Sequence, residues 1–291
     1  MSKPWTYLKF SDKNQSTMRK FMISAAFFVF GLSAIAVWFY SHSLQPKVLL
    51  TTPVEKRELA VLTVATDRKD GLIRFERSCS VHGLACTTLG MGQKWRGFGW
   101  KMNLIKGALE VIKAANGTMV MITDSYDVVM SAGMETILAQ FDKMGADILF
   151  AAEHNCWPDQ GLKDKYPEVD DGRIRFLNAG CFIGPADLLA KMIEAGGEIK
   201  NGMDDQLFYT KIFINSKLRE AFNIKLDTKA ELFQCLNRKP ENIKLLFEAE
   251  KSYVLNVMQN SRPMVFHGNG PGKKLVTTIG KHLEKSWPID E

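Results

Sequence analysis

The sequence predicts an α/β domain in which a mainly parallel β-sheet is flanked by helices, with one apolar helix preceding the domain. Short apolar runs rich in β-forming residues recur after residue 58, and segments with apolar residues at helical spacing separate them. The chain has 291 residues and is 46% hydrophobic, a content that excludes a disordered chain. Strands that alternate with helices form βαβ units, and these favour a parallel sheet.

Each element follows from its local pattern. Runs such as TMVMIT and DILFAA are short and mostly apolar, as buried strands are, whereas residues 100–115 carry apolar side chains three and four residues apart. No internal repeat or linker divides the region, so residues 58–291 are expected to form one domain. The expected elements are strands at Leu59–Thr66, Cys86–Leu89, Thr118–Thr123, Asp147–Ala152 and Phe176–Gly184, and helices at Leu72–Ser80, Trp100–Ala115, Met134–Met144 and Ala186–Glu194.

The segment Phe21–Tyr40 predicts a transmembrane helix. It contains no charged residue, and twenty residues at a rise of about 1.5 Å span about 30 Å, the thickness of a bilayer core. Trp38 and Tyr40 occupy positions typical of an aromatic interface belt. A buried core helix is disfavoured because the segment has no polar face. A cleaved signal peptide is the remaining alternative, but the apolar run exceeds the usual 7–15 residues.

The charges beside this segment predict its orientation. Five basic residues precede it, namely Lys3, Lys9, Lys13, Arg19 and Lys20. The positive-inside rule therefore makes residues 1–20 a cytosolic tail, residues 21–40 a signal-anchor, residues 41–57 a stem and residues 58–291 a lumenal domain. We accordingly expect a single-pass type II membrane protein of the endoplasmic reticulum or Golgi. In that compartment the sequon at Asn116 is a candidate glycosylation site.

The net charge gives no basis for nucleic-acid binding. The formal charge is +6, and the five basic residues of the tail, set against Asp12 alone, supply +4 of it. Only +2 is left for the other 271 residues, so the body of the protein is almost neutral. The five cysteines are odd in number and match no zinc-binding spacing, although disulfides are permitted in the lumen.

Asp124 and Asp127 are the first candidate site. They follow the expected buried strand at Thr118–Thr123, and ligands of open α/β sheets bind at the carboxyl ends of strands. Two carboxylates three residues apart on such a turn can converge on one divalent cation, and hard oxygen ligands suit Mg²⁺ or Mn²⁺. A solvated turn is the alternative interpretation, because aspartate and serine are common in turns.

A second candidate site follows an apolar strand near residue 266. His267 comes first, then three glycines within five residues, then Lys273. A neutral imidazole is a good ligand for Mn²⁺, while glycines let backbone N–H groups approach a phosphate to which a lysine adds positive charge. The spacing matches neither the Walker nor the dinucleotide-binding pattern. A turn with an incidental histidine is the alternative.

Two further features are ambiguous on sequence alone. Asp204 and Asp205 begin a helical run, where acidic residues also serve the helix dipole. Trp157 follows the DILFAA strand and is a candidate wall for a sugar or a base, or else a buried loop tryptophan.

Taken together, the chain resembles the glycosyltransferase domain of the procollagen-lysine hydroxylase/glycosyltransferase (procollagen galactosyl/glucosyltransferase) family, here in a membrane-anchored stand-alone form. The resemblance covers roughly residues 59–275. It is carried, in order and spacing, by TDSYDVV, LFAAEHNCWPD, FLNAGCFIG, DDQLFYTKIF and VFHGNGPGK.

This resemblance implies a GT-A-type, Rossmann-like fold, a UDP-sugar donor and Mn²⁺ or Mg²⁺. It implies metal ligation by Asp124, Asp127 and His267, diphosphate binding by Asn269, Gly270 and Lys273, and nucleotide contacts by Tyr126 and Lys101. It places Trp157, Asp204 and Asp205 on the sugar and acceptor side, with the catalytic carboxylate expected to be Asp205 and Asp204 as the second choice.

The expected function is therefore transfer of a hexose from UDP-glucose or UDP-galactose to a hydroxyl of a protein or glycan acceptor. Hydroxylysine is one candidate acceptor. A membrane partner is expected through residues 21–40, and a homodimer is one further expectation. Arg96–Trp100 is shorter than the corresponding family loop, and the acidic run is reduced to two residues. The reduced acidic run motivates the alternative that the domain is a catalytically inactive UDP-sugar-binding scaffold or a partner of an active transferase. A phosphohydrolase is a weaker third possibility.

Overall fold

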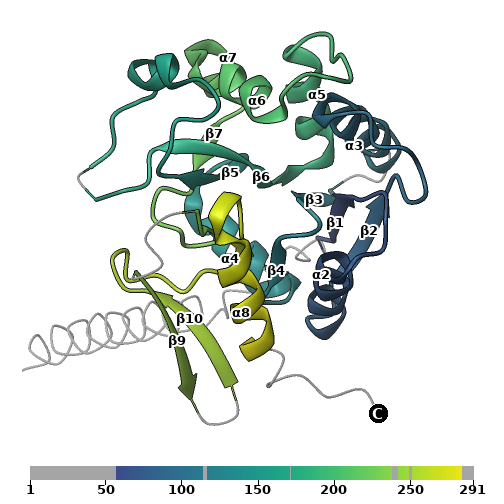
Figure 1. The fold of residues 1–291 in the computed structure, drawn as a ribbon. Coiled ribbons are helices and arrows are strands. Elements are labelled where there is room, and N and C mark those ends of the chain that lie inside the picture. Colours follow the sequence, from purple (N-terminus) through teal and green to yellow (C-terminus); the bar gives the residue numbers. More distant parts are fainter. Residues whose placement is uncertain (1–56, 114–116, 171, 238–241, 249–250, 284–291) are drawn as a thin grey trace, which may run out of the picture. The chain divides into compact units, whose positions relative to one another are not determined.

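The centre of the fold is a six-stranded sheet whose strands are ordered β2-β1-β3-β6-β5-β7 (Figure 1). The computed structural model describes residues 57–113, 117–170, 172–237, 242–248 and 251–283. The sheet strands are β1 (Leu59–Val64), β2 (Ala85–Leu89), β3 (Met119–Thr123), β5 (Ile148–Glu153), β6 (Phe176–Pro185) and β7 (Ile224–Leu226).

This sheet is mixed, which corrects part of the expectation of a mainly parallel sheet. Five strands run in one direction, but β6 is antiparallel to both of its neighbours, β3 and β5. The reason is the connection from β5, because Phe176 at the start of β6 pairs with Glu153 at the end of β5. The chain therefore enters β6 at the same end of the sheet where it leaves β5. A parallel strand would instead require a crossover to the opposite end.

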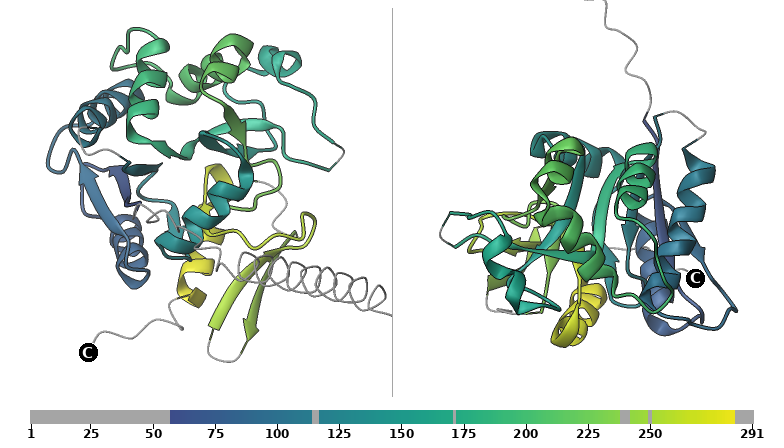
Figure 2. Two further views of the ribbon diagram at one scale, coloured as in Figure 1. Left: turned by 180° about the vertical axis from the view of Figure 1, so that it is seen from behind. Right: turned by 90° about the horizontal axis from the view of Figure 1, so that it is seen from above.

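Helices cover both faces of this sheet (Figures 1 and 2). On one face, α3 (Phe98–Ile112), α5 (Ala186–Ala195) and α6 (Asp205–Ile214) bury apolar side chains against strand residues such as Ile122 and Phe150. On the other face lie α2 (Asp70–Val81) and α4 (Met134–Met144), which pack against Val61 and Met121. The expected helices and strands are thus present, and their boundaries differ from the expected ones by at most three residues.

A second, three-stranded sheet brings distant segments to the same edge. It is ordered β4-β11-β8 and consists of β4 (Val128–Met130), β8 (Phe233–Cys235) and β11 (Val265–His267). In its register, His267 of β11 lies opposite Val128, the residue after Asp127. The helix α8 (Lys273–Leu283) then packs Val276 and Ile279 in one cluster with Val129 and Phe266.

The remaining elements lie outside these two sheets. They are the 3₁₀ turns η1 (Gln160–Lys165) and η3 (Gly270–Gly272), the helix α7 (Ser216–Ala221) and a hairpin of β9 (Ile243–Glu248) and β10 (Lys251–Asn256).

A bulge in β6 shapes the edge of the main sheet. Phe150 of β5 pairs with Phe182, yet the next residue, Ala151, pairs with Asn178, so residues 179–181 have no partner on β5. Bulges bend a strand and redirect its side chains. Here the bulge carries Gly180 to the turn after β3, where the Gly180 carbonyl accepts a hydrogen bond from the N–H of Asp124 at 2.7 Å.

Several expectations lie outside the described residues or concern membranes. The expected tail and anchor, the expected stem (41–57) apart from Arg57, and the sequon asparagine, Asn116, lie outside the described residues. Within the described part of the chain, every helix is too short or too polar to span a bilayer. The five cysteines, all of them described, are free thiols.

Candidate metal centre and its cavity

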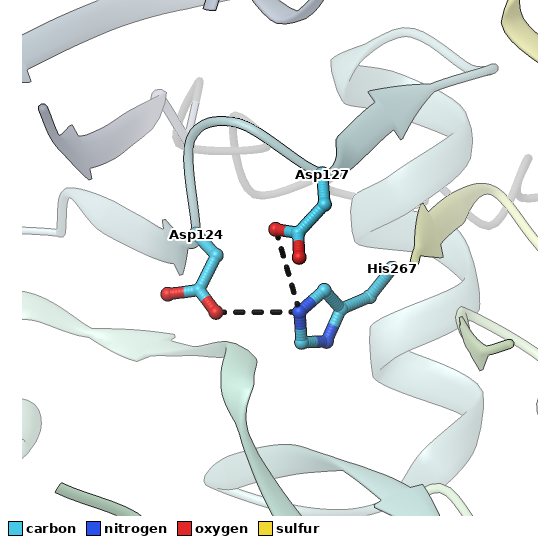
Figure 3. Close-up of side chains that lie close together, drawn as sticks. All are labelled: Asp124, Asp127 and His267. Carbon is cyan, nitrogen blue, oxygen red and sulfur yellow. Dashed lines mark ion pairs between the residues drawn. The ribbon is translucent and has the colours of Figure 1, made fainter. Parts of the chain in front are cut away.

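Three side chains from two distant parts of the sequence converge at the strand ends (Figure 3). Asp124 and Asp127 lie on the turn that joins β3 to β4, and His267 is the last residue of β11. The Nε2 atom of His267 lies 3.2 Å from Oδ2 of Asp124 and 3.7 Å from Oδ1 of Asp127. The N–H of Gly268 donates to the Asp127 carbonyl at 2.7 Å and ties the two segments together.

These three residues can act as ligands of one metal ion. One ligand atom from each lies within 4.8 Å of the others. Two carboxylate oxygens and an imidazole nitrogen form a donor set that suits Mn²⁺ or Mg²⁺, and three protein ligands leave positions for substrate oxygens. The geometry therefore fits the ion that the sequence predicts at Asp124, Asp127 and His267.

Asn178 holds the histidine ring in the orientation that a metal needs. The Oδ1 atom of Asn178 lies 2.9 Å from Nδ1 of His267 and also accepts from the N–H of Gly180 at 2.9 Å. The Nδ2 amide of Asn178 donates to Glu153 at 2.9 Å, so its oxygen must face the ring. His267 consequently carries a proton on Nδ1, so Nε2, which faces the two carboxylates, is the nitrogen that can bind a metal ion once it has no proton of its own.

Burial and neighbouring charges shift the pKa values of the three candidate ligands. Burial alone would raise the pKa of Asp124, but the positive charges of Lys101 and His267 hold that pKa well below its usual range. Burial raises the pKa of Asp127. Burial would lower the pKa of His267, but its hydrogen bond to Asp124 and the charges of both carboxylates raise it.

Lys101 connects the metal cluster to a third carboxylate. It is buried on α3, and its Nζ atom lies 2.5 Å from Oδ1 of Asp124 and 2.8 Å from Oδ2 of Asp205. Burial would lower the pKa of Lys101, but the charges of the two aspartates raise it above its usual range. The lysine thus stays charged and fixes both carboxylates relative to each other.

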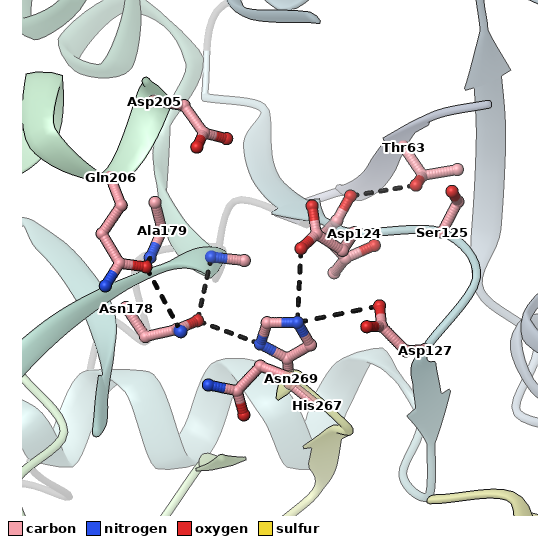
Figure 4. Close-up of polar contacts among 12 residues, drawn as sticks. Thr63, Asp124, Ser125, Asp127, Asn178, Ala179, Asp205, Gln206, His267 and Asn269 are labelled. Carbon is pink, nitrogen blue, oxygen red and sulfur yellow. Dashed lines mark hydrogen bonds and ion pairs between the residues drawn. The ribbon is translucent and has the colours of Figure 1, made fainter. Parts of the chain in front are cut away.

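A cavity of about 740 Å³ opens beside these three residues, and Figure 4 shows polar contacts of several residues that line it. Nine of the residues that the sequence predicts for the site line it: Asp124, Asp127, Trp157, Asp204, Asp205, His267, Asn269, Gly270 and Lys273. Lys273 is the first residue of α8, so the N-terminus of this helix lies at the cavity, where backbone N–H groups favour an anion. The cavity is therefore lined both by the three candidate metal ligands and by a helix N-terminus that can bind an anion.

Tyr126 is at the periphery of this arrangement. Its hydroxyl donates to the carbonyl of Asp67 at 3.0 Å and accepts from the N–H of Asp67 at 3.2 Å, which fixes the turn after β1 to the turn after β3. Neither Tyr126 nor Lys101 belongs to the residues that line the cavity. Their expected contacts with a nucleotide stay predictions.

The two adjacent aspartates have different surroundings. Asp204 is the N-cap of α6, where its Oδ1 accepts from the N–H of Leu207 at 2.7 Å, so the helix-terminal interpretation holds for this residue. Asp205 faces inward to Lys101, and burial raises its pKa. Trp157 is 60% exposed on the cavity wall, which contradicts the alternative of a buried loop tryptophan.

The site also contains a buried polar network that the sequence analysis missed. Glu153 is 4% exposed at the end of β5. Four amide groups donate to its carboxylate, namely those of Asn178, Gln206, Asn237 and Asn269. The position of Glu153 at the end of an apolar strand was the available signal, but its partners are distributed over residues 178–269 and follow no sequence spacing.

The fold and site together define an α/β domain with three candidate metal ligands and a polar cavity at the ends of its strands. Comparison with known proteins then identifies the family of this domain. A model of the PLOD GT domain family matches residues 55–291, and the chain belongs to this family of glycosyltransferase (GT) domains.

Curated relatives agree with this family. The chain is similar to procollagen-lysine,2-oxoglutarate 5-dioxygenase 2 of Mus musculus, with 40% identity over 243 residues, 81% of this chain and 32% of the relative. It is also similar to the multifunctional procollagen lysine hydroxylase and glycosyltransferase LH3 of Homo sapiens, with 36% identity over 81% of this chain and 33% of the relative. The chain thus spans about a third of the length of these relatives.

Among solved structures, one similar chain is a glycosyltransferase involved in the glycosylation of the major capsid of PBCV-1. The TM-score is 0.45 at 13% identity, over 76% of this chain and 99% of the other.

Proposed function

We propose that residues 58–291 transfer a hexose, glucose or galactose, from a UDP-sugar to a hydroxyl group of a protein or glycan acceptor, with Mn²⁺ or Mg²⁺ held by Asp124, Asp127 and His267. The observation that carries the proposal is the convergence of these three side chains at a cavity that the N-terminus of α8 also lines. A divalent cation and a helix N-terminus both favour phosphate oxygens, so a diphosphate suits this combination.

The residues of the chain divide the reaction between them. When bound, the divalent ion supplies charge neutralisation for the departing diphosphate. Lys273 and the N–H groups at the start of α8 bind phosphate oxygens, while Lys101 keeps Asp124 ionised and oriented as a ligand. Burial raises the pKa of Asp205 on the cavity wall, which makes this carboxylate a better proton acceptor for the attacking hydroxyl.

The cavity wall on the side of Trp157 is where we place the sugar and the acceptor. The indole is more than half exposed while the Trp157 carbonyl accepts from the side-chain amide of Gln206 at 3.1 Å. A fixed backbone with an exposed aromatic face is suited to stack against a sugar ring. We further propose that the domain is lumenal, in the endoplasmic reticulum or Golgi, and anchored by residues 21–40.

The decisive experiment measures UDP release from UDP-glucose and UDP-galactose with and without Mn²⁺. We expect metal-dependent release by the wild type and a loss of more than about 100-fold in Asp127→Ala, because changes to residues behind a metal ligand already cost about 10–100-fold. Asp187→Ala, which removes an exposed aspartate paired with Lys191, is the matched control and should retain activity.

The same assay separates transfer from mere binding. Absence of metal-dependent release with every UDP-sugar tested would contradict the proposal. If calorimetry then detected Mn²⁺-dependent UDP binding without any transfer, the domain would be a UDP-sugar-binding scaffold.

A further inference from the structure

Glu153 fixes the direction of two amide groups at the cavity. The Nδ2 groups of Asn237 and Asn269 both donate to its Oε2 atom, that of Asn269 at 3.3 Å. An ionised carboxylate only accepts hydrogen bonds, so each amide must turn its NH₂ group toward Glu153. The Oδ1 atoms of both asparagines therefore point away from the carboxylate.

These two oxygens have no hydrogen-bond partner within the described part of the chain, and both are buried. Asn237 and Asn269 nevertheless line the cavity. A buried acceptor without a donor costs about 1–3 kcal/mol, so a ligand in the cavity whose donor reaches either oxygen would recover this free energy.

The register of the small sheet explains why the two asparagines act as a pair. Strands β8 and β11 are parallel, and Cys235 lies opposite His267. Asn237 and Asn269 each follow two residues later, so both side chains leave the same edge of the sheet at equivalent positions. Asn178 links the pair to the candidate metal ligands, because it contacts both Glu153 and His267.

The chemistry of this pair excludes a phosphate and favours hydroxyl groups. Phosphate oxygens are acceptors, as are the two amide oxygens, and the carboxylate behind them adds negative charge. Hydroxyl groups are donors, and a sugar presents several of them close together. We propose that Asn237 and Asn269, oriented by Glu153, form a subsite that accepts hydrogen bonds from hydroxyl groups of a sugar in the cavity. This proposal rests on the proposed function, and it gives Asn269 a role different from the diphosphate contact expected from the sequence.

Calorimetry in the presence of Mn²⁺ tests the subsite by comparing UDP with UDP-glucose and UDP-galactose. We expect Asn237→Ala and Asn269→Ala each to weaken binding of at least one UDP-hexose about tenfold, the size of one hydrogen bond, while UDP binding stays within about twofold. The control is Asn103→Ala, because Asn103 is an exposed asparagine on α3 and should bind every ligand as the wild type does. Two separate variants guard against misfolding of either one, which thermal unfolding will reveal.

A second arm distinguishes donor sugar from acceptor sugar. Free galactose and glucose are titrated into the complex of the protein with UDP and Mn²⁺. If UDP-hexose binding is unchanged but binding of the free sugar weakens about tenfold in the two variants, the subsite holds the acceptor. UDP-hexoses that lack one hydroxyl then identify the hydroxyl that contacts Asn237. When that hydroxyl is missing, the sugar should bind Asn237→Ala no more weakly than it binds the wild type.

Three results would overturn the subsite. One is equal weakening of UDP and UDP-hexose, which would indicate a phosphate contact or a structural role. Another is unchanged binding in both arms while the wild type binds UDP, which would leave the proposed function standing. Failure of the wild type to bind UDP with Mn²⁺ would remove the subsite and the proposed function together.

Discussion

At the scale of single residues, Lys101 shows how one buried charge can organise a site. Its ammonium group lies between Asp124 and Asp205, which are 81 residues apart in the sequence. Without this lysine, two carboxylates would remain partly or wholly buried near each other. Breaking a buried ion pair by removing one partner costs more than the pair itself contributes, because a charge is left without compensation.

We therefore predict that Lys101→Met lowers the free energy of unfolding of the metal-free protein by about 3 kcal/mol. The apolar stem of methionine retains the packing of the lysine and removes only its charge. Denaturant unfolding monitored by circular dichroism measures the change. Lys106→Met, on the same helix and only half-buried, serves as the control and should change stability by less than about 0.5 kcal/mol.

Mn²⁺ should partly reverse the effect, since a cation at Asp124 replaces some of the lost positive charge. An unfolding free energy for Lys101→Met equal to that of Lys106→Met would show that the buried lysine has no such role.

The sequence predicted the residues of this site unequally well. Asp124 and Asp127 are recognisable because they share one turn after an apolar strand, and His267 because it follows another strand in a glycine-rich segment. Asn237 and Glu153 carry no comparable local signal. Their partnership depends on the register of β8 against β11 and on the end of β5, and tertiary register of this kind is not encoded in any one segment.

At the scale of elements, β6 determines how closely the main sheet approaches the metal cluster. As a buried apolar run, FLNAGCFIG predicts a strand, but nothing in the run distinguishes a parallel from an antiparallel direction. The bulge at residues 179–181 was equally invisible, although the glycine inside the strand is a typical sign of close backbone approach. In the structure, Gly180 lies directly against the ring of His267, and a Cβ atom built there would lie 2.1 Å from its Cε1 atom.

Gly180→Ala should therefore displace His267 and weaken Mn²⁺ binding by more than about tenfold, as changes behind a metal ligand do. Overpacking also predicts a loss of about 1–3 kcal/mol in unfolding free energy. Titration of the protein with Mn²⁺, followed by electron paramagnetic resonance of the free ion, measures the affinity. Gly107→Ala is the control, because a Cβ atom on this helical glycine meets no atom within 4 Å. Wild-type affinity in Gly180→Ala would show that the ring does not need its present position.

At the scale of the whole molecule, the site joins two distant parts of the chain that the pairing of β4 with β11 brings together. The ligands come from the turn between β3 and β4 and from the end of β11, which are 140 residues apart in the sequence (Figure 3). The fold holds two carboxylates and an imidazole close together, so a cation can bind all three at once. An ion that binds the folded state and not the unfolded chain must therefore stabilise the domain as a whole.

We predict that Mn²⁺ at about 100 times its dissociation constant stabilises the fold by about 2.7 kcal/mol. For a domain of this size, each kcal/mol corresponds to roughly 2–4 °C, so the midpoint of thermal unfolding should rise by about 5–10 °C. Scanning calorimetry of the full chain measures this rise, EDTA should reverse it, and UDP added with Mn²⁺ should increase it further. Asp127→Asn keeps the shape of the side chain and removes a ligand charge, so its midpoint should respond little to Mn²⁺. An equal rise in Asp127→Asn would mean that the ion acts elsewhere on the molecule, and no rise in the wild type would mean that the three side chains do not hold it.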